Sequence, residues 1–78
     1  MLHNRISVLR AERGVSRREL ADAVEVNQQT IGYLERGDYG PSMELGLRIA
    51  AFFKAPVDLI FSLEPFEGLV SELTKKGK

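Results

Sequence analysis

The sequence contains no cysteine and no tryptophan, and its one histidine, His3, lies near the start of the chain. Without cysteine there are no disulfides, no thiolate chemistry and no cysteine-ligated zinc, so packing alone must stabilise the fold. A single histidine leaves no metal cluster and no imidazole-based catalytic group. Since the residues also offer no nucleophile–base pair and no clustered carboxylates, we expect neither an enzyme nor a cofactor.

An excess of one charge and long apolar runs are also missing. Eleven Lys and Arg balance 11 Asp and Glu, so the formal net charge is zero. Any affinity for nucleic acid must then come from a local surface patch rather than from a basic chain. No apolar run reaches the roughly 18 residues of a membrane-spanning helix, and the first residues lack the pattern of a secretory signal. We therefore expect a soluble cytoplasmic protein with no membrane partner.

The chain does have apolar residues at helical spacing. A chain of 78 residues forms one small domain, because at this length folding buries only about 60% of the surface that the unfolded chain exposes. Apolar residues recur at intervals of three or four, and no stretch alternates long enough to indicate a strand. Glycine and proline divide the pattern into short pieces. The prediction is an all-α domain with helices at 3–13, 17–24, 28–35, 43–53 and 57–62.

Capping residues mark the starts of three of these helices. Ser16 and Glu19 form a capping-box pair, in which each side chain can accept a hydrogen bond from the other residue's backbone N–H. Asn27 and Ser42 can cap the next two helices, each contributing about 1 kcal/mol. These boundaries are therefore predicted more sharply than helical spacing alone would allow.

The second and third predicted helices have the lengths of a helix-turn-helix unit. The turn at 25–27 is too short for them to lie antiparallel, so they must cross steeply and pack apolar side chains together. The outward face of helix 28–35 is then polar. It consists of Gln28, Gln29, Gly32, Tyr33 and Arg36.

This polar face has the chemistry of a major-groove reader. Glutamine offers a donor and an acceptor side by side to the N6/N7 edge of adenine, so Gln28 and Gln29 can address neighbouring base pairs. Arg10, Arg17 and Arg36 can contact phosphates, and the free N–H groups at helix N-termini can bind phosphate without side-chain charge. Taken singly, each of these side chains is equally compatible with an ordinary solvated surface.

In this register the residues resemble the Cro/C1-type (XRE) helix-turn-helix family over roughly residues 4–62. The motifs that carry the resemblance are Leu9-Arg10, Gly14-Val15-Ser16, Glu19-Leu20-Ala21, Asn27-Gln28-Gln29-Thr30-Ile31, Leu34-Glu35-Arg36-Gly37 and Pro41-Ser42. The resemblance implies a compact five-helix, lambda-repressor-like domain at 1–63, with a short C-terminal helical extension at 64–78. It also implies sequence-specific binding of double-stranded operator DNA, as a homodimer on a pseudo-palindromic site.

The resemblance further suggests roles for individual residues. Those at base edges are Gln28, Gln29 and Tyr33. Those near phosphates are Arg17, Asn27, Thr30, Arg36 and Tyr39. Arg10 and Glu35 occupy the positions of a structural ion pair that ties the first helix to the end of the third.

The residues that depart from the expected pattern include two at helix ends and two inside helices. Glu25 and Lys54 stand where relatives often have glycine after a helix, so we expect strained left-handed conformations of about 1 kcal/mol each. Gly32 and Gly46 lie inside predicted helices, where each is about 1 kcal/mol worse than alanine. We expect Gly46 to permit close packing and Gly32 to let its helix approach a sugar-phosphate backbone.

The C-terminal third carries more apolar side chains than one small core can hide. The segment 65–73 would form a further helix with one apolar face, and the last four or five residues are expected to be disordered. Pairing of two copies through helix 57–62 and this segment would set two recognition helices about 34 Å apart. The predicted interface consists of Ile60, Phe61, Phe66 and Leu69. The alternative is a tail that packs on the first helix of its own chain.

The sequence therefore predicts a small transcriptional regulator that binds DNA as a homodimer and represses. The alternative is an antitoxin-like protein that binds a partner protein through its C-terminal segment and autoregulates by binding DNA.

Overall fold

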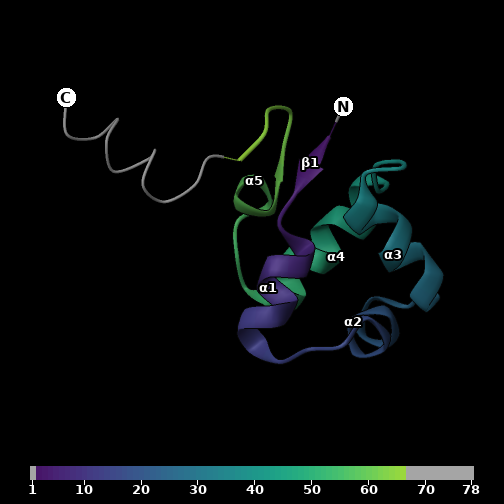
Figure 1. The fold of residues 1–78 in the computed structure, drawn as a ribbon. Coiled ribbons are helices and arrows are strands. Elements are labelled where there is room, and N and C mark those ends of the chain that lie inside the picture. The colour runs from purple at the N-terminus through teal and green to yellow at the C-terminus, as the bar shows by residue number, and fades with distance from the viewer. Residues whose placement is uncertain (1, 67–78) are drawn as a thin grey trace.

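A computed structural model describes residues 2–66 of the chain (Figure 1). Its elements are β1 (His3–Asn4), α1 (Ile6–Arg13), α2 (Arg17–Val24), α3 (Gln28–Arg36), α4 (Met43–Phe53), α5 (Val57–Ile60) and β2 (Phe61–Ser62). The predicted all-α class with five helices is confirmed. The predicted extension helix at 65–73 and the disordered end reach beyond the described residues.

The core draws on every one of these helices. Its members are Ile6, Leu20, Ala21, Val24, Ile31, Leu34, Ile49, Ala50, Phe53 and Ile60. Burying one large aliphatic or aromatic side chain contributes about 1.5–3 kcal/mol, so these residues supply most of the stability. Figure 1 shows α3 at the outer edge of the domain, on the side away from α5. The core therefore holds α3 by its inner face and leaves its outer face free.

All three predicted N-terminal caps are present. The Ser16 hydroxyl accepts a hydrogen bond from the backbone N–H of Glu19 at 3.0 Å, and the Glu19 carboxylate accepts one from Ser16 at 2.9 Å. Asn27 and Ser42 each accept a bond from the backbone N–H three residues later, at 2.9 and 3.1 Å. Helix α3 has only nine residues, and so short a helix is marginally stable by itself. The Asn27 cap therefore helps to determine the residue at which α3 begins.

The predicted strained helix ends are confirmed. Glu25 ends α2 at φ 63°, and Lys54 ends α4 at φ 54°, both in the left-handed region. In that region a residue with a Cβ is less stable than glycine by about 1–2 kcal/mol. The chain adopts the same conformation without that cost at Gly14 and Gly37.

The prediction that the chain has no strand is wrong. His3 pairs with Ser62, and Asn4 with Phe61, in a two-stranded antiparallel ribbon. Two-residue strands give no periodic signal, which is why the sequence pattern does not reveal them.

This ribbon also changes the ends of two predicted helices. The first helix begins at Ile6 instead of residue 3, because the Asn4 side chain accepts a hydrogen bond from the Ile6 backbone N–H at 3.1 Å. The last ends at Ile60 instead of residue 62, because the next two residues extend into β2. Helix α3 runs one residue further than predicted, to Arg36.

Candidate nucleic-acid interface

Helices α2 and α3 form the predicted sharp bend. Leu20 and Val24 of α2 and Ile31 and Leu34 of α3 are each at most 2% exposed, so the apolar faces of the two helices are fully used in the core. Val26, in the turn between them, packs against the same cluster. Because the inner faces are committed to packing, the remaining face of α3 must point outward.

We call Gln28, Gln29, Gly32, Tyr33 and Arg36 the outer face of α3. Its two glutamines, Tyr33 and Arg36 are exposed, and together with Arg17 and Gly32 they line a surface hollow of about 480 Å³. The structure thus brings together all three predicted base contacts and two of the five predicted phosphate contacts.

The other predicted phosphate contacts lie at the two ends of α3. Asn27 caps the helix, and its side-chain oxygen accepts hydrogen bonds from both the backbone N–H and the hydroxyl of Thr30, at 2.9 and 3.1 Å. Tyr39 lies in the loop after α3, with its ring centroid 6.0 Å from that of Tyr33. These residues therefore flank the outer face.

The Arg36 side chain lies across the end of the outer face. Its guanidinium carbon is 4.9 Å from the centre of the Tyr33 ring, which is within the range of a cation–π contact. Its Nε donates a hydrogen bond to Asp38 at 3.1 Å. Both partners of this ion pair are about half exposed, so the pair is worth little to stability.

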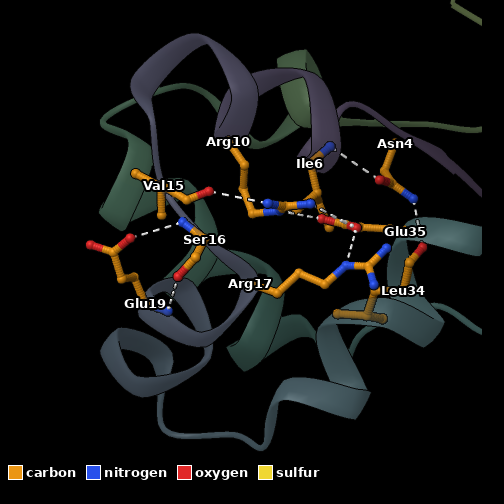
Figure 2. Close-up of polar contacts among 9 residues, drawn as sticks. All are labelled: Asn4, Ile6, Arg10, Val15, Ser16, Arg17, Glu19, Leu34 and Glu35. Atoms are coloured by element: carbon orange, nitrogen blue, oxygen red, sulfur yellow. Dashed lines mark hydrogen bonds and ion pairs between the residues drawn. The ribbon is translucent and has the colours of Figure 1, made fainter.

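The predicted ion pair between Arg10 and Glu35 is present and forms part of a larger network (Figure 2). Arg10 donates from Nε and Nη2 to the Glu35 carboxylate, at 2.6 and 3.2 Å, and from Nη1 to the Val15 carbonyl, at 3.1 Å. Arg17 donates from Nε to the same carboxylate at 2.8 Å. One carboxylate thus ties α1 and the start of α2 to the end of α3.

Glu35 stays ionised within this network. Burial raises the pKa of the Glu35 carboxyl, but the hydrogen bonds and charges of Arg10 and Arg17 outweigh it, so the pKa lies below its ordinary value. The side chain is only 4% exposed, yet two guanidinium groups compensate its charge. The sequence did not reveal Arg17 as a partner of Glu35, because the two residues are 18 positions apart and Arg17 reads as an exposed residue.

Gly32 lies under two guanidinium groups. A Cβ at this position would be 3.7 Å from Arg36 Nη1 and 3.8 Å from Arg17 Nη1. Although Gly32 belongs to the outer face, it is buried. By comparison, a Cβ at Gly46 would meet Pro41 and Phe61, in line with the predicted close packing there.

The predicted dimer interface divides into three parts. Ile60 is fully buried within its own chain, so assigning it to a surface is wrong; its side chain completes the core. Phe61 and Phe66 are half-buried, and the Phe66 ring lies 4.1 Å below the Arg5 guanidinium. Leu69 lies outside the described residues. More exposed apolar residues of this region, which the sequence pattern does not single out, are Val57, Leu59 and Leu63.

Residues 2–66 contain no group of three or more His, Cys, Asp or Glu side chains that could hold a metal ion. Within the same residues, every helix is too short or too polar to cross a membrane.

The sequence of the chain is similar to those of known helix-turn-helix proteins. A helix-turn-helix family model covers residues 6–60. The uncharacterized HTH-type transcriptional regulator YgzD of Bacillus subtilis (strain 168) is 38% identical over 63 residues, which are 81% of this chain and 96% of the relative. An uncharacterized HTH-type transcriptional regulator of Archaeoglobus fulgidus is 38% identical over 66 residues, 85% of this chain and 94% of the relative.

Solved structures share the fold. A crystal structure from Bacteroides fragilis superposes with a TM-score of 0.72 at 24% identity, over 80% of this chain and all of that one. A transcriptional regulator from Listeria innocua superposes with a TM-score of 0.66 at 24% identity, over 92% of this chain and 69% of that one. At this identity the likeness establishes the arrangement of the helices.

Proposed function

This chain belongs to the Cro/C1-type (XRE) helix-turn-helix family of DNA-binding transcriptional regulators, and we propose that it binds operator DNA by placing the outer face of α3 in the major groove. The observation that carries the proposal is the exposure of Gln28 and Gln29 side by side at the start of a helix whose inner face is fixed in the core. An α-helix fits the width of the major groove, and glutamine matches the edge of adenine there.

Phosphate contacts on either side of α3 would fix its register on the duplex. Asn27 and Thr30 lie at the N-terminus of α3, where free backbone N–H groups favour an anion. Tyr39 and the loop 38–40 lie at its other end. Such contacts position a protein without reading sequence, which suits a chain of zero net charge.

Selection of preferred sequences from a random duplex pool tests this proposal. We expect the wild-type chain to enrich one motif, and Gln29→Ala to lose the base preference at one position of each half-site by about 5- to 150-fold. Glu12→Ala, which removes an exposed polar side chain from α1, is the matched control and should leave the motif unchanged. The proposal fails if the wild type enriches no sequence, or if Gln29→Ala preserves every base preference.

We further propose that two copies pair through α5 and the residues that follow it. The support is that three apolar side chains of this region are exposed, Val57, Leu59 and Leu63, the last of which is 81% exposed. A two-fold pairing there would present two copies of α3 to successive major grooves, as a pseudo-palindromic operator requires. Repression is the simplest use of such a dimer. If the operator overlaps a promoter, the protein bound to it blocks polymerase.

The mass of the chain in solution tests the pairing. We expect twice the chain mass of 8.7 kDa, and a shift toward monomer for Leu63→Glu. Met43→Glu is the matched control, because Met43 is as exposed as Leu63 but lies at the start of α4. A wild-type monomer that still selects a DNA motif would contradict the dimer. It would favour the alternative of an antitoxin-like protein, which uses these exposed apolar side chains to bind a partner protein.

A further inference from the structure

The outer face of α3 has a glycine, Gly32, at its centre, and the side chain of Arg17 from α2 covers this position. Gly32 has no Cβ, yet it is buried, because Arg17 and Arg36 cover it. The Arg17 Cζ and Nη1 atoms would lie 4.0 and 3.8 Å from a Cβ at position 32. The Arg17 guanidinium therefore lies in van der Waals contact with the point at which a side chain at position 32 would begin.

The Arg17 guanidinium is held in a fixed direction. Its Nε donates to Glu35, whose side chain is 4% exposed and is itself held by two hydrogen bonds from Arg10. Within residues 2–66, no atom accepts a hydrogen bond from the Nη groups of Arg17. The carboxylate thus fixes one edge of the guanidinium and leaves the other N–H groups free to bind.

Arg36, which covers Gly32 from the other side, is held less firmly. The two arginine side chains are similarly exposed, at 54% for Arg36 and 45% for Arg17, but their carboxylate partners differ: Asp38 is 50% exposed, whereas Glu35 is 4% exposed. An exposed ion pair exchanges readily with water and fixes no single geometry. Of the two arginines, Arg17 is the one whose orientation the fold determines.

We propose that Arg17, although it lies on α2, is a base-reading residue that recognises a guanine next to the bases read by Gln28 and Gln29. The inference rests on the proposed function and assigns Arg17 to a base edge instead of the phosphate that the family resemblance suggests. Guanine presents its O6 and N7 acceptors together in the major groove, and a guanidinium can bind both at once. Glu35 is the positioning residue, since it holds the guanidinium over Gly32 and limits the rotamer freedom lost on binding.

Sequence selection with the full chain tests the inference. We expect the wild type to prefer guanine at one position of each half-site, and Arg17→Ala to lose that preference by about 5- to 150-fold while every other position keeps its preference. Alanine removes every donor to O6 and N7, whereas lysine would keep donors that can reach both acceptors. Arg18→Ala removes a neighbouring exposed arginine and should leave the guanine preference intact.

A second measurement uses the wild-type chain and does not depend on the stability of a variant. Replacing that guanine by 7-deazaguanine removes the N7 acceptor and should weaken wild-type binding by about fivefold or more. The same substitution at any other guanine of the selected operator serves as the control.

Two results would overturn the inference while leaving the proposed function standing. One is a motif whose guanine preference is unchanged in Arg17→Ala. The other is a uniform loss of affinity in Arg17→Ala across all sequences, with a salt dependence reduced by about one phosphate contact, which is the signature of a backbone contact. A wild-type chain that enriches no motif would instead contradict the proposed function itself.

Discussion

Glu35 receives two hydrogen bonds from Arg10, at 2.6 and 3.2 Å, across 25 residues of sequence. Arg10 is 18% exposed, so the pair is largely shielded from water. The pair joins the first helix to the end of the helix that carries the proposed DNA-reading face. The position of that face thus depends on a contact with α1 (Figure 2).

Substitution of Glu35 should therefore destabilise the fold. In Glu35→Gln the guanidinium groups of Arg10 and Arg17 lose their shared counter-charge. Breaking a buried pair costs about 3–5 kcal/mol, and the partial exposure of Arg17 places the expected loss near 3 kcal/mol. Urea unfolding at neutral pH measures the lost free energy of unfolding. The control is Glu12→Gln, because Glu12 is an exposed residue of α1. A loss as small as that of the control would show that the network contributes little.

The same residue predicts a dependence of stability on pH. Because the pKa of Glu35 is below its ordinary value of 4.5 in the folded chain, the ionised carboxylate stabilises the fold above that value. That contribution is lost as the pH falls through the folded-state pKa. The difference in unfolding free energy between the wild type and Glu35→Gln should accordingly narrow below about pH 4.5.

Urea titrations at several pH values test this narrowing. The hydrogen bond from the Ser16 backbone lowers the pKa of Glu19 as well, but both proteins retain Glu19, so its effect cancels in the comparison. A difference that stays constant down to about pH 3 would contradict the assignment to Glu35.

Gly32→Ala should stabilise the chain. Alanine is better than glycine inside a helix by about 1 kcal/mol, and the added Cβ would meet the two guanidinium groups at ordinary contact distance. Thermal unfolding measures the gain. Gly14→Ala is the matched control with the opposite expectation, because Gly14 has φ 64° and alanine is strained there by about 1 kcal/mol. A destabilised Gly32→Ala would mean that the arginines leave no room for a Cβ.

Lys54→Gly should also stabilise the chain. Lys54 ends α4 in the left-handed region, where glycine is free of the clash between Cβ and backbone. We expect a gain of about 1 kcal/mol in the free energy of unfolding. Lys54→Ala removes the same side chain but keeps the Cβ, so it should give no comparable gain. Equal effects of the two substitutions would show that the lysine side chain, and not the backbone, determines the result.

The parts of the fold that the sequence predicts are those determined by neighbouring residues. The Ser16–Glu19 capping box and the left-handed ends at Glu25 and Lys54 each depend on a few consecutive positions. The ribbon between His3–Asn4 and Phe61–Ser62 depends on a long-range pairing of two residues on each side, so its periodic signal is too short to detect.

The candidate site divides in the same way. The outer face of α3 follows from helical spacing, and the structure places Gln28, Gln29 and Tyr33 on it. The bond between Arg17 and Glu35 could not be predicted from spacing, because it depends on the rotamers of side chains on two helices. The burial of Ile60 could not be predicted either, because a four-residue helix is too short for its inner face to be recognised in the sequence.

The proposed function requires the outer face of α3 to enter the major groove. Titration of the isotopically labelled chain with its selected duplex, followed by NMR, would show whether it does. We predict that the largest shifts occur at the side-chain amides of Gln28 and Gln29 and at the backbone of α3, with small shifts at exposed residues of α1. Shifts concentrated on α1 or on the exposed side of α4, with both glutamine amides unmoved, would contradict it.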